Sequence, residues 1–242
     1  IHGGGYEMGA GSQGLYNGAN LARHGVVLVT VNYRLGPMGF LAHPALSRES
    51  NEGVSGNYGI LDQIAALEWV KENIAEFGGD PDRVTIFGES AGGGSVFALL
   101  CSPLAKGLFH RAISESGPTL NWSHLEESRF GYPSAEAAGA EMAESLGIED
   151  GPDAAAKLRD QDVESLLDMT ANNERPTKVD FRSVALRMAP IVDGHVIPDD
   201  PMTIFEEGKQ NDVPLIVGCN GDEATMFTMM AKLPTTVDAL TE

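Results

Sequence analysis

Basic residues and cysteines are scarce in this sequence, and no long hydrophobic run occurs in it. Lys and Arg total 16 against 35 Asp and Glu, which gives a formal net charge of −19. A surface of this charge repels the phosphates of nucleic acids and the headgroups of anionic lipids. The longest strongly apolar stretch, residues 25–31, is far shorter than the roughly 18 to 20 residues that cross a bilayer. We therefore expect no nucleic-acid partner and no membrane span.

The two cysteines, Cys101 and Cys219, lie far apart, so we expect two free thiols rather than a disulfide framework. No cluster of His, Cys, Asp or Glu has the spacing of a structural zinc site, and neither a P-loop nor a dinucleotide-binding fingerprint is present. The sequence thus predicts no metal and no cofactor. It opens at Ile1 without an initiator Met or a leader peptide, so we expect an internal segment of a longer protein, and the localisation stays open.

Short apolar runs alternate with helical patterns along the 242 residues. The continuous β-branched run within residues 25–34 predicts a strand buried on both faces, and shorter runs at 84–87, 110–114 and 213–218 predict three more strands. Apolar residues recur every three or four positions over residues 57–77 and predict an amphipathic helix. This alternation is typical of an α/β fold with a mostly parallel sheet.

The acidic, Ala-rich tract of residues 134–169 lacks a strand pattern, and we interpret it as a helical excursion. No internal repeat and no convincing linker divides the rest of the sequence. Residues 1–242 are therefore predicted to form a single, incomplete α/β domain.

The segment Gly88-Glu89-Ser90-Ala91-Gly92 matches the pattern G-x-S-x-G. In this pattern a Ser sits at a strained turn between a strand and a helix, and the positions two residues away on either side have no room for side chains. The predicted strand before the segment and the small and apolar residues after it provide that context. The N-terminus of the following helix would offer backbone N–H groups to a developing negative charge. A plain glycine-rich turn is the alternative interpretation.

Three consecutive glycines, Gly3-Gly4-Gly5, follow His2. Bare backbone can bring N–H groups within hydrogen-bond reach of an oxyanion, whereas a flexible loop is the alternative interpretation. The glycine loop followed by the G-x-S-x-G segment is the order found in an α/β-hydrolase. Together the two motifs indicate acyl transfer.

Several segments resemble the type-B carboxylesterase family, which includes esterases, lipases and cholinesterases. The resemblance spans nearly the whole chain apart from the acidic tract, and it implies an α/β-hydrolase fold that is truncated here at both ends. The segments that carry it are Ile1 to Tyr6, Asn32 to Gly36, Gly56 to Gln63, Phe77 to Pro81, Val84 to Gly93, Ser102 to Gly117, Pro190 to Gly194 and Gly218 to Glu223.

The resemblance also implies roles for individual residues. Ser90 would be the nucleophile and Glu223 the acid of a catalytic triad, while Gly4, Gly5 and Ala91 would supply the N–H groups of the oxyanion hole. The residues themselves support Ser90 and the glycine loop. For Glu223 they indicate only a carboxylate after a strand and a turn, which suits a solvated loop equally well.

Further residues match family positions but also have a purely structural interpretation. Glu89 resembles an acid near the substrate pocket, yet a Glu at a helix start also suits the helix dipole. Ser116 resembles a Ser that hydrogen-bonds the triad acid, with an ordinary turn residue as the alternative. Trp122 would border the acyl pocket, or else pack in the core or at its rim. The resemblance further suggests a largely buried ion pair between Arg34 and Asp62.

No histidine follows Glu223, although α/β-hydrolases have the chain order Ser, acid, His. Each histidine present has an ordinary interpretation in a loop, at the start of a strand or on an exposed face. We therefore expect the catalytic His in a C-terminal part outside this sequence. The six histidines, all before the acid, are His2, His24, His43, His110, His124 and His195.

These features predict a serine carboxylic-ester hydrolase that acts on a small-molecule ester through an acyl-enzyme, with this segment inactive on its own. A binding or adhesion protein is the alternative from another class, because the family includes cell-surface members without the nucleophile. Ser90, Glu223 and the glycine loop are all retained here, which favours the enzyme. A lipase of the hormone-sensitive group, which shares the His-Gly-Gly-Gly motif, is disfavoured by Glu89 and by a Glu rather than an Asp as the acid.

Overall fold

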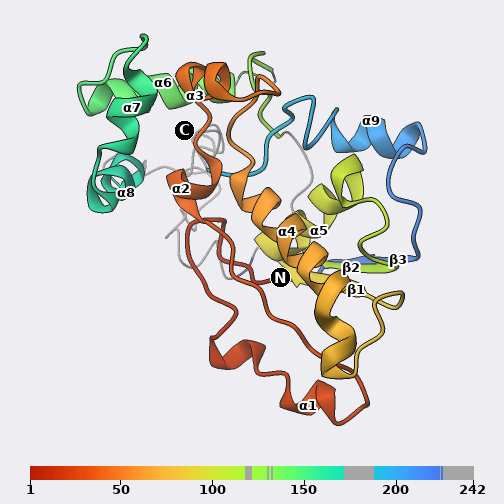
Figure 1. Cartoon of the computed structure of the whole chain (residues 1–242). Helices are drawn as coiled ribbons and strands as arrows, with labels where there is room; N and C mark the ends of the chain where they lie inside the picture. The colour runs from red at the N-terminus through yellow and green to blue at the C-terminus, as the bar shows by residue number, and fades with distance from the viewer. Residues whose placement is uncertain (118–121, 130, 132, 172–187, 224, 226–242) are drawn as a thin grey trace, which may run out of the picture.

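The computed structural model describes residues 1–117, 122–129, 131, 133–171, 188–223 and 225. Three parallel strands form a sheet in the order β1-β2-β3, and helices pack beside it (Figure 1). The strands are β1 (Thr85–Glu89), β2 (Arg111–Glu115) and β3 (Leu215–Gly218). The last three predicted strands and the parallel α/β arrangement are therefore confirmed.

Two long helices follow the predicted pattern. Helix α4 (Tyr58–Asn73) continues into the 3-10 helix η2 (Ile74–Phe77), which ends at Gly78 with a left-handed φ of 80°. Helix α5 (Ala91–Cys101) begins directly after Ser90 and is buried along nearly its whole length. The remaining elements outside the acidic tract are η1 (Gly14–Tyr16), α1 (Ala19–Ala22), α2 (Gly36–Phe40), α3 (Pro44–Glu49), η3 (Pro103–Ala105) and α9 (Pro201–Glu206).

The acidic tract contains three helices, α6 (Ala135–Ser145), α7 (Ala154–Arg159) and α8 (Val163–Ala171). Helix α6 begins after Ser134, whose hydroxyl accepts a hydrogen bond from the Ala137 N–H, as N-cap serines commonly do. In Figure 1 these helices gather at one end of the molecule beside α2 and α3, whereas α1 lies at the opposite end. The acidic tract therefore adds to the end of the molecule rather than to the sheet.

The main apolar core lies where α4 and α5 pack together and α5 covers the sheet. Ile60 of α4 and Val96 and Leu99 of α5 are all 0% exposed. Full burial of such a side chain contributes about 1.5 to 3 kcal/mol. A buried hydrogen bond of 3.0 Å from Gln63 Nε2 to Ser95 Oγ also joins the two helices. These contacts fix the N-terminus of α5, which carries the candidate site, relative to the strands.

The strand predicted over residues 25–34 is not formed in the described structure. Residues 26–34 have no assigned helix or strand, and none of the described strands pairs with them. Val26 and Val27 are 50% and 45% exposed rather than buried on both faces. β-branched residues favour extended backbone, but a strand also needs a neighbour that supplies ladder hydrogen bonds. The prediction was wrong because the local pattern carries no information about that neighbour.

Arg34 and Asp62 form the expected ion pair, but the pair is not largely buried. Arg34 Nη2 lies 2.8 Å from Asp62 Oδ1, and Arg34 Nε donates to Asp62 Oδ2 at 2.8 Å. The side chain of Arg34 is 52% exposed and that of Asp62 is 26% exposed. Burial disfavours the ionised form of Asp62, but hydrogen bonds from Arg34 outweigh it and lower the pKa of Asp62. The burial prediction was wrong because Arg34 lies at the end of residues 26–34, most of which are exposed.

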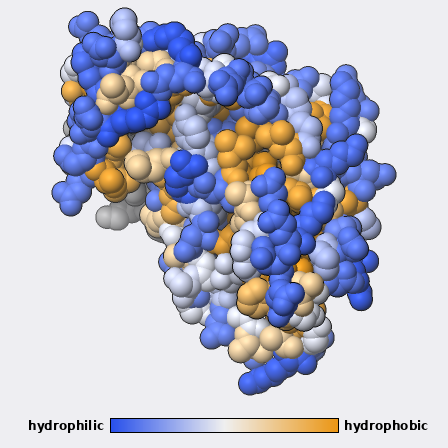
Figure 2. All heavy atoms as spheres, in the orientation of Figure 1, coloured by the Kyte–Doolittle hydropathy of each residue, from blue (hydrophilic) through white to orange (hydrophobic). Residues whose placement is uncertain are grey.

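Hydrophilic side chains cover most of the face seen in Figure 2, and an apolar area lies near its middle. Exposed apolar side chains also occur on β3, where Ile216 is 66% and Val217 is 60% exposed. Strand β3 therefore differs from β1 and β2, whose exposed positions are polar or charged. Within the described ranges, no helix has both the length and the apolar character needed to cross a bilayer.

Candidate active site

The candidate site lies at the carboxyl ends of the three parallel strands. The register aligns Glu89 of β1 with Glu115 of β2, and Glu115 with Gly218 of β3. Two backbone hydrogen bonds continue this alignment, from the Ser90 N–H to the Glu115 carbonyl at 2.9 Å and from the Ser116 N–H to the Gly218 carbonyl at 2.8 Å. The loops that follow the strands therefore start at one edge of the sheet, where ligands of open α/β sheets bind.

Ser90 occupies a strained turn between β1 and α5. Its φ of 57° and ψ of −124° lie in a region that costs a non-glycine residue roughly 1 to 3 kcal/mol. Gly88 and Gly92 make the turn possible, because a Cβ on Gly88 would lie 2.5 Å from the Gly92 carbonyl carbon. A Cβ on Gly92 would lie 2.3 Å from the Ile1 carbonyl oxygen. The turn holds Ser90 at the N-terminus of α5, where the first N–H groups have no partner within the helix.

The glycine loop passes directly beside this turn. A Cβ on Gly3 would lie 2.7 Å from the Glu89 carbonyl oxygen and 3.3 Å from Ser90 Cβ. Gly4 and Gly5 follow with positive φ angles of 114° and 66°, which glycine adopts without strain. Bare backbone at Gly3 thus allows the loop to lie against the turn that carries Ser90.

Glu223 lies in the turn after β3 and is held by two donors. Ser116 Oγ and the Asn220 N–H each donate to Glu223 Oε2 at 2.7 Å. The hydrogen bond from the Ser116 hydroxyl has the larger effect and that from the Asn220 N–H the smaller, and together they lower the pKa of Glu223 below its ordinary value. The contact expected between Ser116 and Glu223 is therefore present. The carboxylate is ionised at neutral pH and oriented, as a triad acid would need to be.

Glu89 links the nucleophile turn to the acid electrostatically. The pKa of Glu89 is raised above its ordinary value. Partial burial is the largest cause, and the negative charges of Glu223 and Glu115 add to it. Glu89 is also the chain neighbour of Ser90. Negative charge is therefore concentrated beside Ser90, which favours a positively charged group such as an imidazolium at this place.

Trp122 is 7% exposed and belongs to the main apolar core, which fits the packing interpretation. Its proposed role at an acyl pocket stays a prediction.

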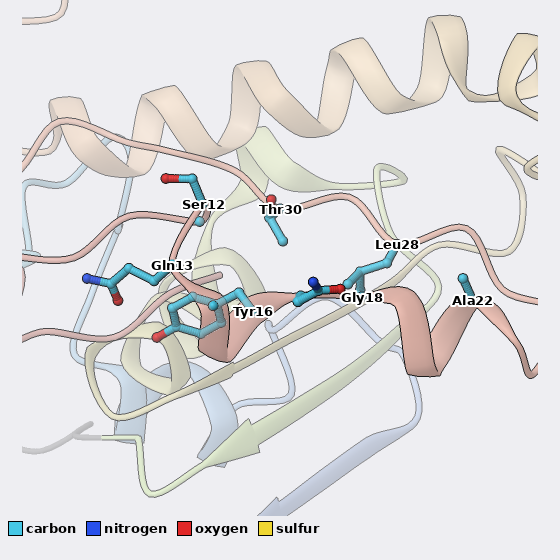
Figure 3. Close-up of a pocket in the computed structure, with 10 residues that line it drawn as sticks. Ser12, Gln13, Tyr16, Gly18, Ala22, Leu28 and Thr30 are labelled. Atoms are coloured by element: carbon cyan, nitrogen blue, oxygen red, sulfur yellow. The ribbon is translucent and has the colours of Figure 1, made fainter.

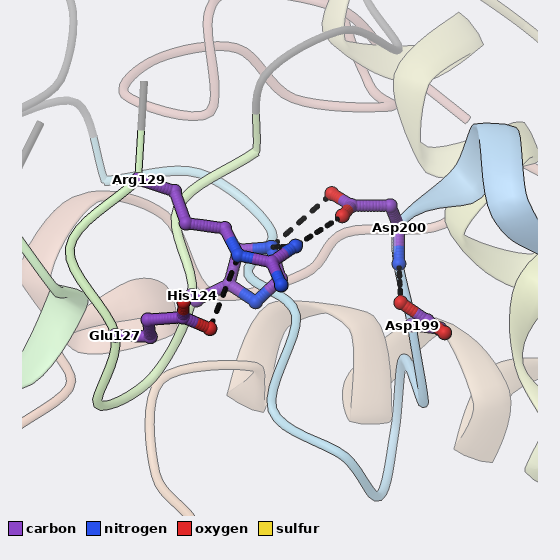
Figure 4. A network of polar contacts seen from close by, with 5 residues as sticks. All are labelled: His124, Glu127, Arg129, Asp199 and Asp200. Atoms are coloured by element: carbon purple, nitrogen blue, oxygen red, sulfur yellow. Dashed lines mark hydrogen bonds and ion pairs between the residues drawn. The ribbon is translucent and has the colours of Figure 1, made fainter. Parts of the chain in front are cut away.

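A polar network lies after Trp122 in the chain, and in it Arg129 and His124 both face Asp200 (Figure 4). Arg129 Nη1 donates to Asp200 Oδ2 at 2.8 Å, and His124 Nε2 lies 3.2 Å from Asp200 Oδ1. This network anchors the segment after Trp122 to the start of α9.

Among the described residues, no hydrogen bond joins a histidine ring to Ser90 or Glu223. His24 is exposed, and the ring contacts of the other five identify no general base for Ser90. These contacts are His2 Nδ1 with the Gly3 carbonyl, His43 Nδ1 with the Ala45 N–H, His110 Nδ1 with the Val84 N–H, His124 Nε2 with Asp200, and His195 Nδ1 with Glu52.

The described part of the chain has no arranged metal centre, and one of its two thiols is buried. No group of three or more His, Cys, Asp or Glu residues there is arranged to hold a metal ion. Cys219 is exposed and Cys101 is buried, and both are free. Burial raises the pKa of Cys101 to about 12, so this thiol stays protonated and unreactive.

Two tyrosines to which the sequence analysis gave no role contact the glycine loop. The Gly3 N–H donates to Tyr16 Oη at 3.2 Å, and Tyr33 Oη donates to the His2 carbonyl at 2.9 Å. No local motif marks either tyrosine. Tyr33 lies within the segment Asn32 to Gly36, and a contact with the glycine loop cannot be predicted from that segment.

Known proteins resemble this chain in sequence over most of its length. The profile of the carboxylesterase family matches residues 1–240. The chain is 44% identical over 229 residues to fumonisin B1 esterase of Sphingopyxis macrogoltabida, which covers 94% of this chain and 39% of that protein. It is 42% identical over 228 residues to para-nitrobenzyl esterase of Bacillus subtilis (strain 168), covering 94% of this chain and 43% of that protein.

A solved structure of a PNB esterase matches with a TM-score of 0.80 and 41% sequence identity, over 94% of this chain and 45% of that chain. This match confirms the predicted α/β-hydrolase fold. The chain spans about 40% of the length of the two curated relatives. By the match to the family profile over residues 1–240, the chain belongs to the carboxylesterase family.

Proposed function

We propose that this chain carries the nucleophile, the oxyanion loop and the acid of a serine carboxylesterase that acts on small-molecule esters. The observation that carries the proposal is the conformation of Ser90, with φ 57° and ψ −124°, beside the glycine loop. Such strain persists where the surrounding structure fixes it, and this turn is the one that presents a nucleophilic Ser in α/β-hydrolases. Two relatives named as esterases, 44% and 42% identical to the chain, support the same reaction class.

In the proposed reaction, Ser90 Oγ attacks the ester carbonyl carbon while a His takes the Ser90 proton. The N–H groups of Gly4, Gly5 and Ala91 stabilise the negative charge that develops on the carbonyl oxygen. Collapse of the tetrahedral intermediate breaks the bond to the alcohol, which leaves with the proton returned by the His. Water then attacks the acyl group on Ser90 by the same route and releases the carboxylic acid.

Glu223 orients the His and stabilises its protonated form in this proposal. We place the His C-terminal to Glu223 and outside this sequence, because α/β-hydrolases have the order Ser, acid, His. The span of about 40% of the curated relatives leaves room for such a part. The negative charges of Glu223 and Glu115, which act together with burial to raise the pKa of Glu89, support a site that favours an imidazolium.

Hydrolysis of p-nitrophenyl acetate by the full-length protein tests the proposal. Ser90→Ala should lower kcat by about 10⁴-fold or more, because the nucleophile is lost and oxyanion-hole and binding effects remain. Ser128→Ala is the matched control, since Ser128 is exposed and lies on another segment, and its kcat should equal that of the unsubstituted protein. A Ser90→Ala variant whose kcat stays within tenfold would overturn the nucleophile assignment.

A further inference from the structure

The peptide group between His2 and Gly3 forms hydrogen bonds with a tyrosine hydroxyl at its carbonyl and with another at its N–H. The carbonyl of His2 and the N–H of Gly3 belong to the same peptide. Tyr33 Oη donates to that carbonyl at 2.9 Å, and that N–H donates to Tyr16 Oη at 3.2 Å. Because one group accepts and the other donates, the two tyrosines fix the rotation of the whole peptide plane.

Packing makes these contacts hard for water to replace on the Tyr33 side. His2 is 2% and Tyr33 is 6% exposed, and their rings stack with centroids 4.5 Å apart and an interplanar angle of 20°. Tyr16 belongs to η1, half-buried, with its ring centroid 6.3 Å from that of His2. The Tyr16 ring also forms part of the wall of a cavity of about 380 Å³, beside residues such as Ser12 and Thr30 (Figure 3).

Within the glycine loop, the Gly4 carbonyl accepts hydrogen bonds from the Glu7 and Met8 N–H groups at 3.1 Å, and the two tyrosines add support from outside the loop. Gly4 and Gly5 have no side chains that could pack, and their positive φ angles are one choice among many open to glycine. A change in the orientation of the peptide between His2 and Gly3 would therefore pass along the chain to the Gly4 and Gly5 N–H groups. A misplacement of about 1 Å can cost on the order of 10²-fold in rate at a catalytic site.

We infer that Tyr16 and Tyr33 are positioning residues that hold the Gly4 and Gly5 N–H groups in the orientation that binds an oxyanion. The inference rests on the proposed esterase function. Neither hydroxyl donates to substrate in this account. Both act through the peptide that joins His2 to Gly3.

The protonation state of Tyr33 agrees with this arrangement. The pKa of Tyr33 is raised well above its ordinary value, mainly by burial and to a smaller extent by the neighbouring Tyr16. The Tyr33 hydroxyl therefore keeps its proton throughout the neutral range and acts as the donor that the His2 carbonyl needs.

The test replaces each hydroxyl while keeping the ring, in the full-length protein. Tyr16→Phe and Tyr33→Phe should each lower kcat for p-nitrophenyl acetate about tenfold, with KM changed less than twofold, because the oxyanion forms only in the transition state. The double variant should lose about as much as the more affected single variant, because both hydroxyls hold one peptide. Each rate is divided by the concentration of reactive Ser90, so that unfolded protein does not lower the kcat that is reported. Tyr58→Phe is the control, since Tyr58 starts α4 and its ring packs under the Arg34 guanidinium.

A trifluoromethyl ketone provides a readout that a purely structural role would not move. Ser90 Oγ adds to its carbonyl carbon, the Ser90 proton passes to the catalytic His, and the former carbonyl oxygen becomes an oxyanion in the hole. The inhibition constant should rise in each Phe variant by the same factor by which kcat/KM falls, and Tyr58→Phe should leave it unchanged.

The outcomes separate this inference from the proposed function. If the unsubstituted protein neither hydrolyses the ester nor binds the ketone, the proposed function fails. If it does both and the two Phe variants match it per reactive site, the positioning role is wrong while the function stands. A double variant whose loss equals the product of the single losses would also contradict the shared peptide. Variants that lose thermal stability but keep kcat and ketone affinity would assign the hydroxyls a structural role alone.

Discussion

Ser116 Oγ and Glu223 Oε2 lie 2.7 Å apart, and this hydrogen bond joins the loops that follow β2 and β3. Ser116 has a φ of 50°, so the residue that holds the acid is strained in the same sense as Ser90, which has a φ of 57°. Strained backbone conformations cluster at functional sites. The two strained serines at the ends of adjacent strands therefore indicate a functional site at this edge of the sheet.

Removal of the Ser116 hydroxyl should raise the pKa of Glu223 toward its ordinary value. The pKa of Glu223 is lowered in the folded protein, so its stabilising effect is present above the ordinary pKa and is lost as the pH falls through the lowered one. In Ser116→Ala this loss should be smaller and should be complete at higher pH, because the pKa of Glu223 in the folded protein lies closer to its ordinary value. A ¹³C NMR titration of the Glu223 carboxyl measures the shift directly.

Ser116→Gly separates the hydrogen bond from the backbone strain at the same position. It should show the same rise in the pKa of Glu223 as Ser116→Ala, but it should melt at a higher temperature, because glycine adopts a φ of 50° without strain. An unchanged Glu223 pKa in both variants would refute the assigned role of the Ser116 contact.

Gly92→Ala should destabilise the protein by about 2 kcal/mol or more. The added Cβ would lie 2.3 Å from the Ile1 carbonyl oxygen, a backbone atom that cannot rotate away as a side chain can. Gly151→Ala is the control, because a Cβ there meets no atom within 4 Å. Thermal melting should show a clear loss for the first variant and a change within about 0.5 kcal/mol for the second. Equal melting temperatures for Gly92→Ala and Gly151→Ala would contradict the close contact between Gly92 and the Ile1 carbonyl.

Asn57→Ala should cost about 3 kcal/mol. Asn57 is 2% exposed, its Nδ2 donates to the Ile191 carbonyl and to Asp193 Oδ2, and its Oδ1 accepts from the Ile191 N–H. Truncation leaves the buried groups of Ile191 without partners, and each such group costs about 1 to 3 kcal/mol. Asn73→Ala, which removes an exposed amide that donates to the Trp69 carbonyl, should cost far less in the same urea titration. Similar losses for the two variants would contradict this account.

Local sterics and periodicity explain what the sequence could predict. The turn at Ser90 depends on glycines two residues away on either side, and α4 depends on apolar spacing within its own length. The contact of Gly88 with Gly92 and the apolar spacing of α4 are set by neighbours in the chain, so both can be found without a structure. The contact of Gly92 with Ile1 cannot.

Long-range contacts explain what the sequence could not predict. The run at residues 26–34 has the composition of a buried strand, but a strand also requires a partner, which the run itself does not encode. The exposure of Arg34 follows from that same segment. The contacts of Tyr16 and Tyr33 with the glycine loop span 13 and 31 residues, and no repeat or spacing connects their ends.

The most direct test of the central claim is mass spectrometry of the full-length protein after reaction with a fluorophosphonate. A nucleophilic Ser forms a bond to phosphorus and releases fluoride, which leaves a stable adduct. We predict one adduct per molecule on Ser90, and no adduct in Ser90→Ala. Labelling of another residue, or failure of the active protein to react at Ser90, would contradict the assignment of this chain as the nucleophile-bearing part of a serine carboxylesterase.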